Sequence, residues 1–252
     1  MLQPLYFQLF IALVIVIVSI TKPQAKTLDA AVGWTKPPYV IAETNSGFEL
    51  ELVSAIMATL GHKVNHIYVP FGRSYSMLSD GEVDMTLTVG SRGQLPNMIL
   101  SDVYINYQNV AIALKSTNIN ISKITELEHY SVVAFQNAST LLGEQYQQTI
   151  AKCAMYMELP YQRNQVEMLL QGNIDIAVMD VNIFMHLSEL ISGTSQLDKV
   201  DIFRLFPVNN YRIGFKDALL KDQFNQALAS YMKSDDYLKL IKKYQLFPAN
   251  MY

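Results

Sequence analysis

Polar side chains follow the predicted ends of strands in this sequence, and their types suit the binding of a small charged solute. Ser139 and Thr140 open a predicted helix, where hydroxyl and backbone N–H groups can hold an anionic group. Asp180 ends an apolar run, and its carboxylate can meet an ammonium group. Each position also has a simpler interpretation, because hydroxyl and carboxylate groups at these places cap helices without any ligand.

Arginine and aromatic residues near other predicted strand ends extend this set. Arg73 and Arg92 could clamp a carboxylate through the planar guanidinium fork. Trp34, Tyr39 and Phe71 offer flat apolar walls, although Tyr39 and Phe71 would serve equally well in packing. Because ligands of open α/β sheets bind beyond the carboxyl ends of the strands, we expect these groups to line one cleft. The full set of candidate ligand-binding residues is Trp34, Tyr39, Phe71, Arg73, Thr88, Arg92, Ser139, Thr140 and Asp180.

Motifs for catalysis and for metal binding are absent from the sequence. It has no Gly-x-Ser-x-Gly elbow, no phosphate-binding glycine loop and no His-Glu-x-x-His motif. The single cysteine, Cys153, excludes an intramolecular disulfide and a zinc site built from thiolates. We therefore expect no catalytic residues, no cofactor and no metal. The histidines also lack metal-ligand spacing: His62, His66, His129 and His186.

Composition places the chain among folded proteins and argues against nucleic-acid binding. Half of the 252 residues are hydrophobic and 16% are charged, whereas about 25% is typical. Enough apolar surface is therefore available to outweigh the entropy cost of ordering the chain. The net charge of −3 leaves no basic field to hold nucleic acid.

The N-terminal segment has the features of an export signal. Residues 9–18 are consecutively apolar, which is short for a membrane span of about 20 residues but suits a signal-peptide core of about 7–15. Ala25 can be the last residue before cleavage. We expect a cleaved signal over 1–25 and a periplasmic protein, with an uncleaved anchor as the alternative.

Strand-like and helix-period segments alternate along the rest of the chain, which is the pattern of α/β architecture. A helix beginning after Gly47 is predicted from the apolar positions 52, 53, 56, 57 and 60. Residues 102–115 and 211–215 look extended. The other predicted helices are 74–79, 139–151, 181–191, 217–232 and 235–244, and the predicted strands are 28–32, 64–69, 83–88, 130–135 and 174–180.

A short motif occurs twice and indicates two similarly built lobes. Leu78, Gly81 and Asp84 recur, at the same spacing, as Leu169, Gly172 and Asp175, and a buried strand follows each time. Such a helix end, glycine turn and strand is common in α/β proteins. The interpretation as two lobes is strengthened because the alternation of predicted strands and helices also begins again after residue 116.

The chain resembles the bacterial periplasmic solute-binding proteins of the amino-acid type, family 3. The resemblance rests on the order and spacing of several short motifs that extend over nearly the whole chain after the signal. These motifs are Pro37-Pro38-Tyr39, Gly47-Phe48-Glu49-Leu50-Glu51, Leu78-x-x-Gly81-x-x-Asp84, Ser101-Asp102-Val103-Tyr104, Ala138-Ser139-Thr140 and Leu169-x-x-Gly172-x-x-Asp175-x-x-x-x-Asp180.

This resemblance implies an α/β, two-lobed fold, the periplasmic binding protein type II fold, with two crossing hinge strands. The crossing stretches would be 111–115 and 208–215. Lobe one would begin with 26–111, and lobe two would be 112–207. The last part, 208–252, would return through the hinge and add C-terminal helices to lobe one.

The resemblance also suggests roles for particular residues. Phe71 sits where the family stacks an aromatic ring on the ligand, and Thr88 where polar contacts follow a strand. Ser139 and Thr140 match the helix-opening groups that meet the ligand carboxylate, and Asp180 matches the acid that takes the ammonium group.

One departure puts the identity of the ligand in doubt. The family usually carries a carboxylate-clamping arginine seven residues before the serine that matches Ser101, but Gln94 stands there. Arg92 or Arg73 could replace it. If neither does, an ordinary α-amino acid is not the ligand, because losing a charge-assisted clamp removes about 1.5–3 kcal/mol.

The sequence therefore predicts a monomeric binding protein that delivers a small polar solute to a membrane ABC permease or a receptor. One alternative is a sensor or interaction module with a degenerate site. A periplasmic dehydratase-like enzyme on the same fold is the other.

Overall fold

The computed structural model describes residues 26–70, 72–90 and 98–247. The predicted signal segment, Phe71, Arg92 and Gln94 lie outside the described residues. None of the helices in the described part combines the length and the apolar character needed to cross a membrane.

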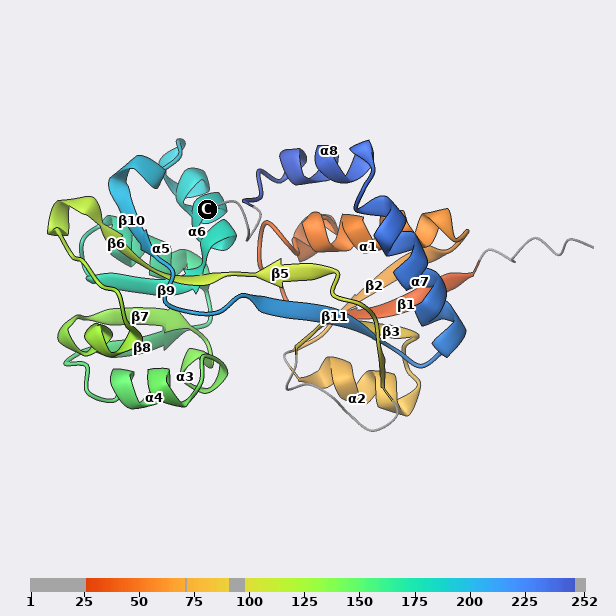
Figure 1. The fold of residues 1–252 in the computed structure, drawn as a ribbon, viewed down its shortest axis with the longest axis horizontal. Coiled ribbons are helices and arrows are strands. Elements are labelled where there is room, and N and C mark those ends of the chain that lie inside the picture. The colour runs from red at the N-terminus through yellow and green to blue at the C-terminus, as the bar shows by residue number, and fades with distance from the viewer. Residues whose placement is uncertain (1–25, 71, 91–97, 248–252) are drawn as a thin grey trace, which may run out of the picture.

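Lobe one contains a six-stranded sheet in the order β2-β1-β3-β11-β4, with β5 paired to β11 (Figure 1). Its strands are β1 (Thr27–Val32), β2 (Lys63–Tyr68), β3 (Met85–Val89), β4 (Ile99–Leu100), β5 (Ile105–Tyr107) and β11 (Asn209–Phe215). Its helices are α1 (Phe48–Thr59), α2 (Arg73–Asp80), α7 (Ala218–Tyr231) and α8 (Asp235–Lys243), with a 3-10 turn at Ala42–Thr44.

Lobe two contains a five-stranded sheet in the order β10-β6-β9-β7-β8. Its strands are β6 (Asn109–Leu114), β7 (Val132–Phe135), β8 (Tyr156–Leu159), β9 (Ile176–Asp180) and β10 (Val200–Phe203). Its helices are α3 (Ala138–Leu141), α4 (Glu144–Ile150), α5 (Gln162–Leu170) and α6 (Val181–Ser192), with 3-10 turns at Lys115–Thr117, Ile124–His129 and Leu197–Lys199.

Apolar runs in the central strands explain why helices cover both sheets. Every residue of β9 is buried, as are all but one residue in each of β3 and β6. Strands that are buried on both faces require near-continuous apolar sequence, and these segments supply it. The predicted α/β class and the two-lobed architecture are confirmed.

The repeated motif has the same structural role in both lobes. Its two glycines adopt φ values of 81° and 72°, which end α2 and α5 in the left-handed region. The Asp84 carboxylate accepts the N–H of Asp29 in β1, and the Asp175 carboxylate accepts the N–H of Ser131 just before β7, both at 2.9 Å. Each aspartate therefore ties its own strand to the neighbouring parallel strand.

The chain passes between the lobes twice. Tyr107, at the end of β5, pairs with β11 of lobe one, whereas Asn109, at the start of β6, pairs with β9 of lobe two. The first crossing is therefore at Gln108, and the expected stretch 111–115 lies within lobe two, in β6 and at the start of the 3-10 turn that follows it. The second crossing is 204–208, between β10 and β11.

Two predictions of local structure need correction. The single helix expected over 139–151 is split into α3 and α4 at Gly143, whose φ of 97° cannot continue a helix. The strands β8 and β10 were not predicted. Most residues of these two strands are only partly buried. The strands therefore do not need the continuous apolar run or the strict apolar–polar alternation by which strands are recognised in a sequence.

Candidate functional site

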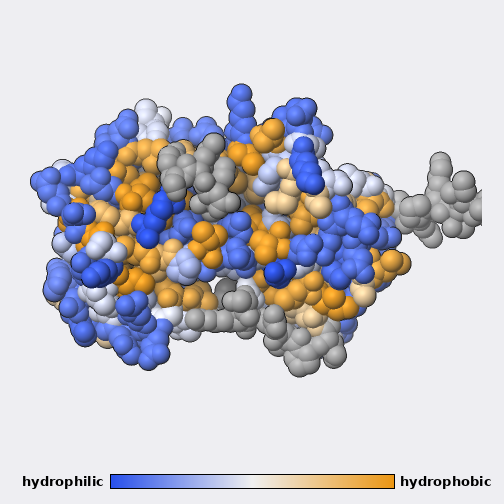
Figure 2. Space-filling model, in the orientation of Figure 1, coloured by the Kyte–Doolittle hydropathy of each residue, from blue (hydrophilic) through white to orange (hydrophobic). Residues whose placement is uncertain are grey.

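The carboxyl edges of the two sheets face each other across the crossing strands. In lobe one, Val89 at the end of β3 pairs with Arg212, the middle residue of β11, which follows the second crossing by four residues. In lobe two, Asp180 at the end of β9 pairs with Asn109, directly after the first crossing. The surface is indented between the lobes below these strands (Figure 2). Residues that follow the parallel strands therefore flank this interlobe region.

Glu49 is the centre of a polar cluster at the lobe-one edge. It lies in the first turn of α1 with no exposed surface, and its carboxylate accepts hydrogen bonds from the hydroxyls of Tyr104, Tyr107 (2.8 Å) and Thr88 (2.5 Å). Lys36 Nζ lies 3.7 Å from Glu49 Oε2 and donates to Thr88 Oγ1 at 3.0 Å. The buried charge is thus paired and hydrogen-bonded, as a stable interior requires.

This cluster fixes the end of β3 in an uncommon conformation. Thr88 has a φ of 56°, and its N–H donates to the hydroxyl oxygen of Tyr104 at 2.9 Å. Burial, followed by the charge of Glu49, raises the pKa of Tyr104 and of Tyr107 well above the usual value, so both remain hydroxyl donors. The Lys36 ammonium also lies 5.6 Å from the centre of the Tyr107 ring. Thr88 and Lys36 are therefore held by a buried scaffold.

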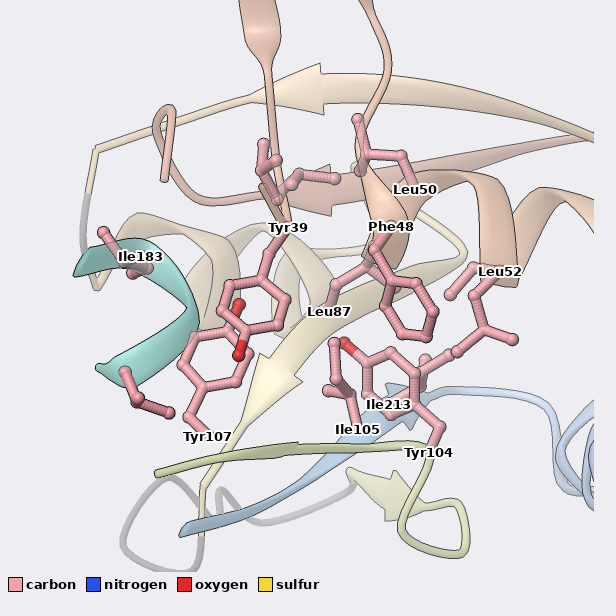
Figure 3. Packing of buried hydrophobic residues seen from close by; sticks show 14 of the residues in the cluster. Tyr39, Phe48, Leu50, Leu52, Leu87, Tyr104, Ile105, Tyr107, Ile183 and Ile213 are labelled. Atoms are coloured by element: carbon pink, nitrogen blue, oxygen red, sulfur yellow. The ribbon is translucent and has the colours of Figure 1, made fainter. Parts of the chain in front are cut away.

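Tyr39 connects this scaffold to lobe two. Its buried ring stacks on Tyr107 with the centroids 4.1 Å apart, and Figure 3 shows the two rings face to face. Its hydroxyl donates to Asp180 Oδ1 at 3.1 Å and accepts from Asn182 Nδ2 at 3.0 Å. Tyr39 therefore serves the packing between lobes, which is the simpler of its two predicted roles.

Asp180 is used by the fold itself. It is 3% exposed and caps α6 by accepting the N–H groups of Asn182 (2.9 Å) and Ile183 (3.1 Å), and it also accepts the N–H of Gln108 at 2.8 Å. Burial raises the pKa of Asp180 to about 6, against the effect of these hydrogen bonds. The capping alternative thus describes its contacts in this structure.

The Glu158 carboxylate is bound at the start of α3, where an anionic group of a ligand was predicted to bind. Its carboxylate accepts the N–H of Asn137 at 2.6 Å, the N–H of Ser139 at 2.8 Å and the hydroxyl of Tyr156 at 2.8 Å. Partial burial acts to raise the pKa of Glu158, but the hydrogen bonds from Ser139, Tyr156 and Asn137 outweigh it and lower the pKa. The residue therefore stays ionised near neutral pH.

The remaining predicted residues lie at the lobe edges. Trp34 follows β1 and is 61% exposed, Arg73 is exposed at the start of α2, and Thr140 is exposed in α3. Phe71 and Arg92 are outside the described residues. The structure thus groups Tyr39 with Asp180, Thr88 with the Glu49 cluster, and Ser139 with Glu158.

Lys36, Glu49 and Glu158 belong to the site but were not among the predicted ligand-binding residues. The segment Lys36-Pro37-Pro38-Tyr39 directly after β1 was a usable signal for Lys36. No comparable signal existed for Glu158, because the strand that carries it, β8, was not recognised.

The C-terminal segment forms a further contact between the lobes. Asn182 Oδ1 accepts the N–H of Phe247 at 2.8 Å, and Asn182 Nδ2 lies 3.3 Å from the Phe247 carbonyl oxygen. Beside this contact, a cavity of about 340 Å³ lies between α6 and the end of α8. Among the described residues, no group of three or more His, Cys, Asp or Glu side chains could hold a metal ion.

Comparison with known proteins gives both a family and a fold. The family model for bacterial extracellular solute-binding proteins, family 3, matches residues 28–247. A search of curated proteins finds no match.

Several solved structures share this fold at low sequence identity. An ancestral cationic amino acid solute binding protein superposes with a TM-score of 0.70 at 18% identity, covering 86% of this chain and 95% of that one. The ligand-binding core of GluR0 in complex with L-glutamate has a TM-score of 0.70 at 12% identity, covering 88% and 99%. A histidine kinase sensor domain with similarity to periplasmic binding proteins has a TM-score of 0.66 at 18% identity, covering 86% and 95%.

Proposed function

This chain belongs to the bacterial extracellular solute-binding proteins, family 3, and from that premise we propose that it captures a small polar solute between its lobes. One observation carries this proposal: two α/β lobes present the carboxyl edges of their parallel strands to each other across two crossings. Such edges are where open α/β sheets bind ligands.

Capture would occur by hinge closure about the two crossings at Gln108 and 204–208. Lobe one would contribute Trp34 and Thr88, and lobe two would contribute the start of α3 together with Glu158, which is bound there. A solute that contacts both edges binds the closed form more tightly than the open form, and this difference in affinity drives closure.

Delivery to a membrane importer or a receptor would follow capture. We infer that the protein is exported to the periplasm with removal of 1–25, and that it works as a monomer. We also expect no catalysis, and turnover of prephenate by the purified protein would contradict this expectation.

A thermal-shift screen with amino acids, amines and organic acids tests solute capture. A true ligand at 100 times its dissociation constant adds about 2.7 kcal/mol of stability. For a chain of this size, that corresponds to a rise in Tm of about 5–11 °C.

The fluorescence of Trp34 provides a second measurement, which reports closure of the lobes. Trp34 is the only tryptophan in the chain and is largely exposed, so closure of the lobes should change its emission. An osmolyte that raises Tm without entering the cleft serves as the control and should leave the emission unchanged. If no solute changes either signal, capture is refuted.

A sensor or interaction module is the second candidate function. It is favoured by the fact that Asp180 and Glu158 already have protein partners, which reduces what a solute could contact. A screen without any binder, combined with retention of the native fold, would support this candidate.

A further inference from the structure

Glu158 places a carboxylate of the protein where a carboxylate of a solute would otherwise bind. Two N–H groups at the start of α3, those of Asn137 and Ser139, each donate to a different oxygen of Glu158. A solute carboxylate would have to displace this side chain before using these donors. That displacement would break two charge-assisted hydrogen bonds and the bond from Tyr156.

The charge of Glu158 is not compensated by its partners in the described structure. These partners are neutral donors: two backbone amides, the Tyr156 phenol and the Ser139 hydroxyl. Glu158 is only partly buried, and it is the last residue but one of β8, whose carboxyl end lies on the lobe-one side of the sheet. A carboxylate in this position attracts a cation, because an opposite charge stabilises a partly desolvated ion.

Aromatic side chains at the two facing edges suit the same ligand chemistry. Trp34 directly follows β1 and is 61% exposed, and Tyr161 follows β8 and is 72% exposed. Exposed aromatic faces bind organic ammonium ions by cation–π attraction. By contrast, Lys36 is committed to Glu49 and Thr88.

We propose that Glu158 determines specificity, so that the cleft takes a small organic ammonium ion without a carboxylate. This inference rests on the proposed function of solute capture. The proposed ligand differs from an α-amino acid in lacking the carboxylate, because the N–H groups at the start of α3 that would bind a ligand carboxylate are already bound by Glu158.

Matched pairs of ligands that differ only in the carboxylate test the inference. The dissociation constants of L-lysine and cadaverine, and of L-arginine and agmatine, are measured by isothermal titration calorimetry on the full mature protein. We expect at least one of the two amines to bind, and to bind at least tenfold more tightly than its parent amino acid.

Glu158→Gln provides the second arm, because it removes the charge while keeping the shape. We expect this variant to lose at least tenfold in amine affinity and to reduce the selectivity against the amino acid. The matched control is Glu167→Gln on α5 of the same lobe, where the carboxylate pairs with Arg163 at the surface. The control should keep the wild-type affinities.

The possible outcomes separate the inference from the proposed function. If an amino acid binds as tightly as its amine, the inference is wrong while solute capture stands. If Glu158→Gln retains both affinity and selectivity, Glu158 is not the determinant. If solutes of other classes bind but neither amine does, the inference alone fails, and if nothing binds, both proposals fail. If Glu158→Gln does not fold, the ratio of amino-acid to amine dissociation constants of the wild-type protein still tests the inference.

Discussion

The buried carboxylate of Glu49 allows a quantitative test of the scaffold beneath the cleft. Its two oxygens accept three hydroxyl donors, and the Lys36 ammonium lies 3.7 Å away. In Glu49→Gln the side chain keeps its shape but has only one acceptor oxygen. Its amide N–H₂ group would then face hydroxyls, those of Tyr107 or of Tyr104 and Thr88, that now donate to the carboxylate.

The expected cost follows from these contacts. Hydrogen bonds to a charged group contribute about 1.5–3 kcal/mol each, and breaking a buried ionic pair by removing one partner costs about 3–5 kcal/mol. We therefore expect Glu49→Gln to lower the free energy of unfolding by about 3–5 kcal/mol, or Tm by about 6–20 °C.

Urea unfolding followed by circular dichroism measures this loss. Glu43→Gln is the matched control, because Glu43 is exposed and accepts only the Thr35 hydroxyl, at 3.1–3.2 Å; it should change stability by less than about 0.5 kcal/mol. A loss below about 1 kcal/mol for Glu49→Gln would refute the reasoning, because a buried carboxylate that accepts three hydroxyl donors cannot be replaced at so small a cost. A double-mutant cycle with Lys36→Met should show a coupling of about 0.5–3 kcal/mol between the two residues.

Three further predictions concern the contacts between the lobes. Tyr39→Phe removes the hydroxyl bound to Asp180 and should lower the free energy of unfolding in urea by about 1–3 kcal/mol. The control Tyr161→Phe, at the surface, should change this free energy by less than about 0.5 kcal/mol. Equal effects of the two substitutions would contradict the contact between Tyr39 and Asp180. Because burial raises the pKa of Asp180 to about 6, the native state holds this proton more tightly than the unfolded chain. Stability should therefore fall as pH rises from about 4 to about 7, by up to about 3 kcal/mol, and a slope that persists in Asp180→Asn would argue against this assignment. Asn182→Ala removes the acceptor of the Phe247 N–H, so hydrogen exchange at that amide should accelerate at least tenfold, and unchanged protection would show that the contact is not formed in solution.

Local sequence signals predicted most of the regular elements because those elements depend on nearby residues. The apolar positions of α1 recur at helical spacing, and Gly61 stands just beyond the helix end with a φ of 81°. Ser234 caps α8 through its hydroxyl, as its type and place predict. Strands such as β8 escaped prediction because sheet pairing, which links Glu158 to Ala134, creates them more than their own composition does.

The candidate site was predicted in part, since residue type indicates what a side chain can do but not which partner it meets. Thr88 and Ser139 were named as ligand contacts, and the structure places both beside carboxylates of the protein, those of Glu49 and Glu158. Asp180 was named for a ligand ammonium or a helix cap, and the cap is what its contacts show. Glu49 lies 39 residues from Thr88 and Glu158 lies 19 residues from Ser139 along the chain, whereas the cap partners of Asp180 are only two and three residues away.

The sequence by itself determined the α/β alternation, the repeated glycine and aspartate motif and the family resemblance, because all of these arise from short segments in a constant order. The tertiary structure alone decided which charges are already satisfied. Tyr39 meets Asp180 across 141 residues because the two lobes meet at their strand ends, and Glu49 meets Tyr107 across 58 residues because α1 and β5 pack together within lobe one. Hydrogen bonds require partners within about 3 Å, and that proximity is a property of the fold rather than of any local pattern.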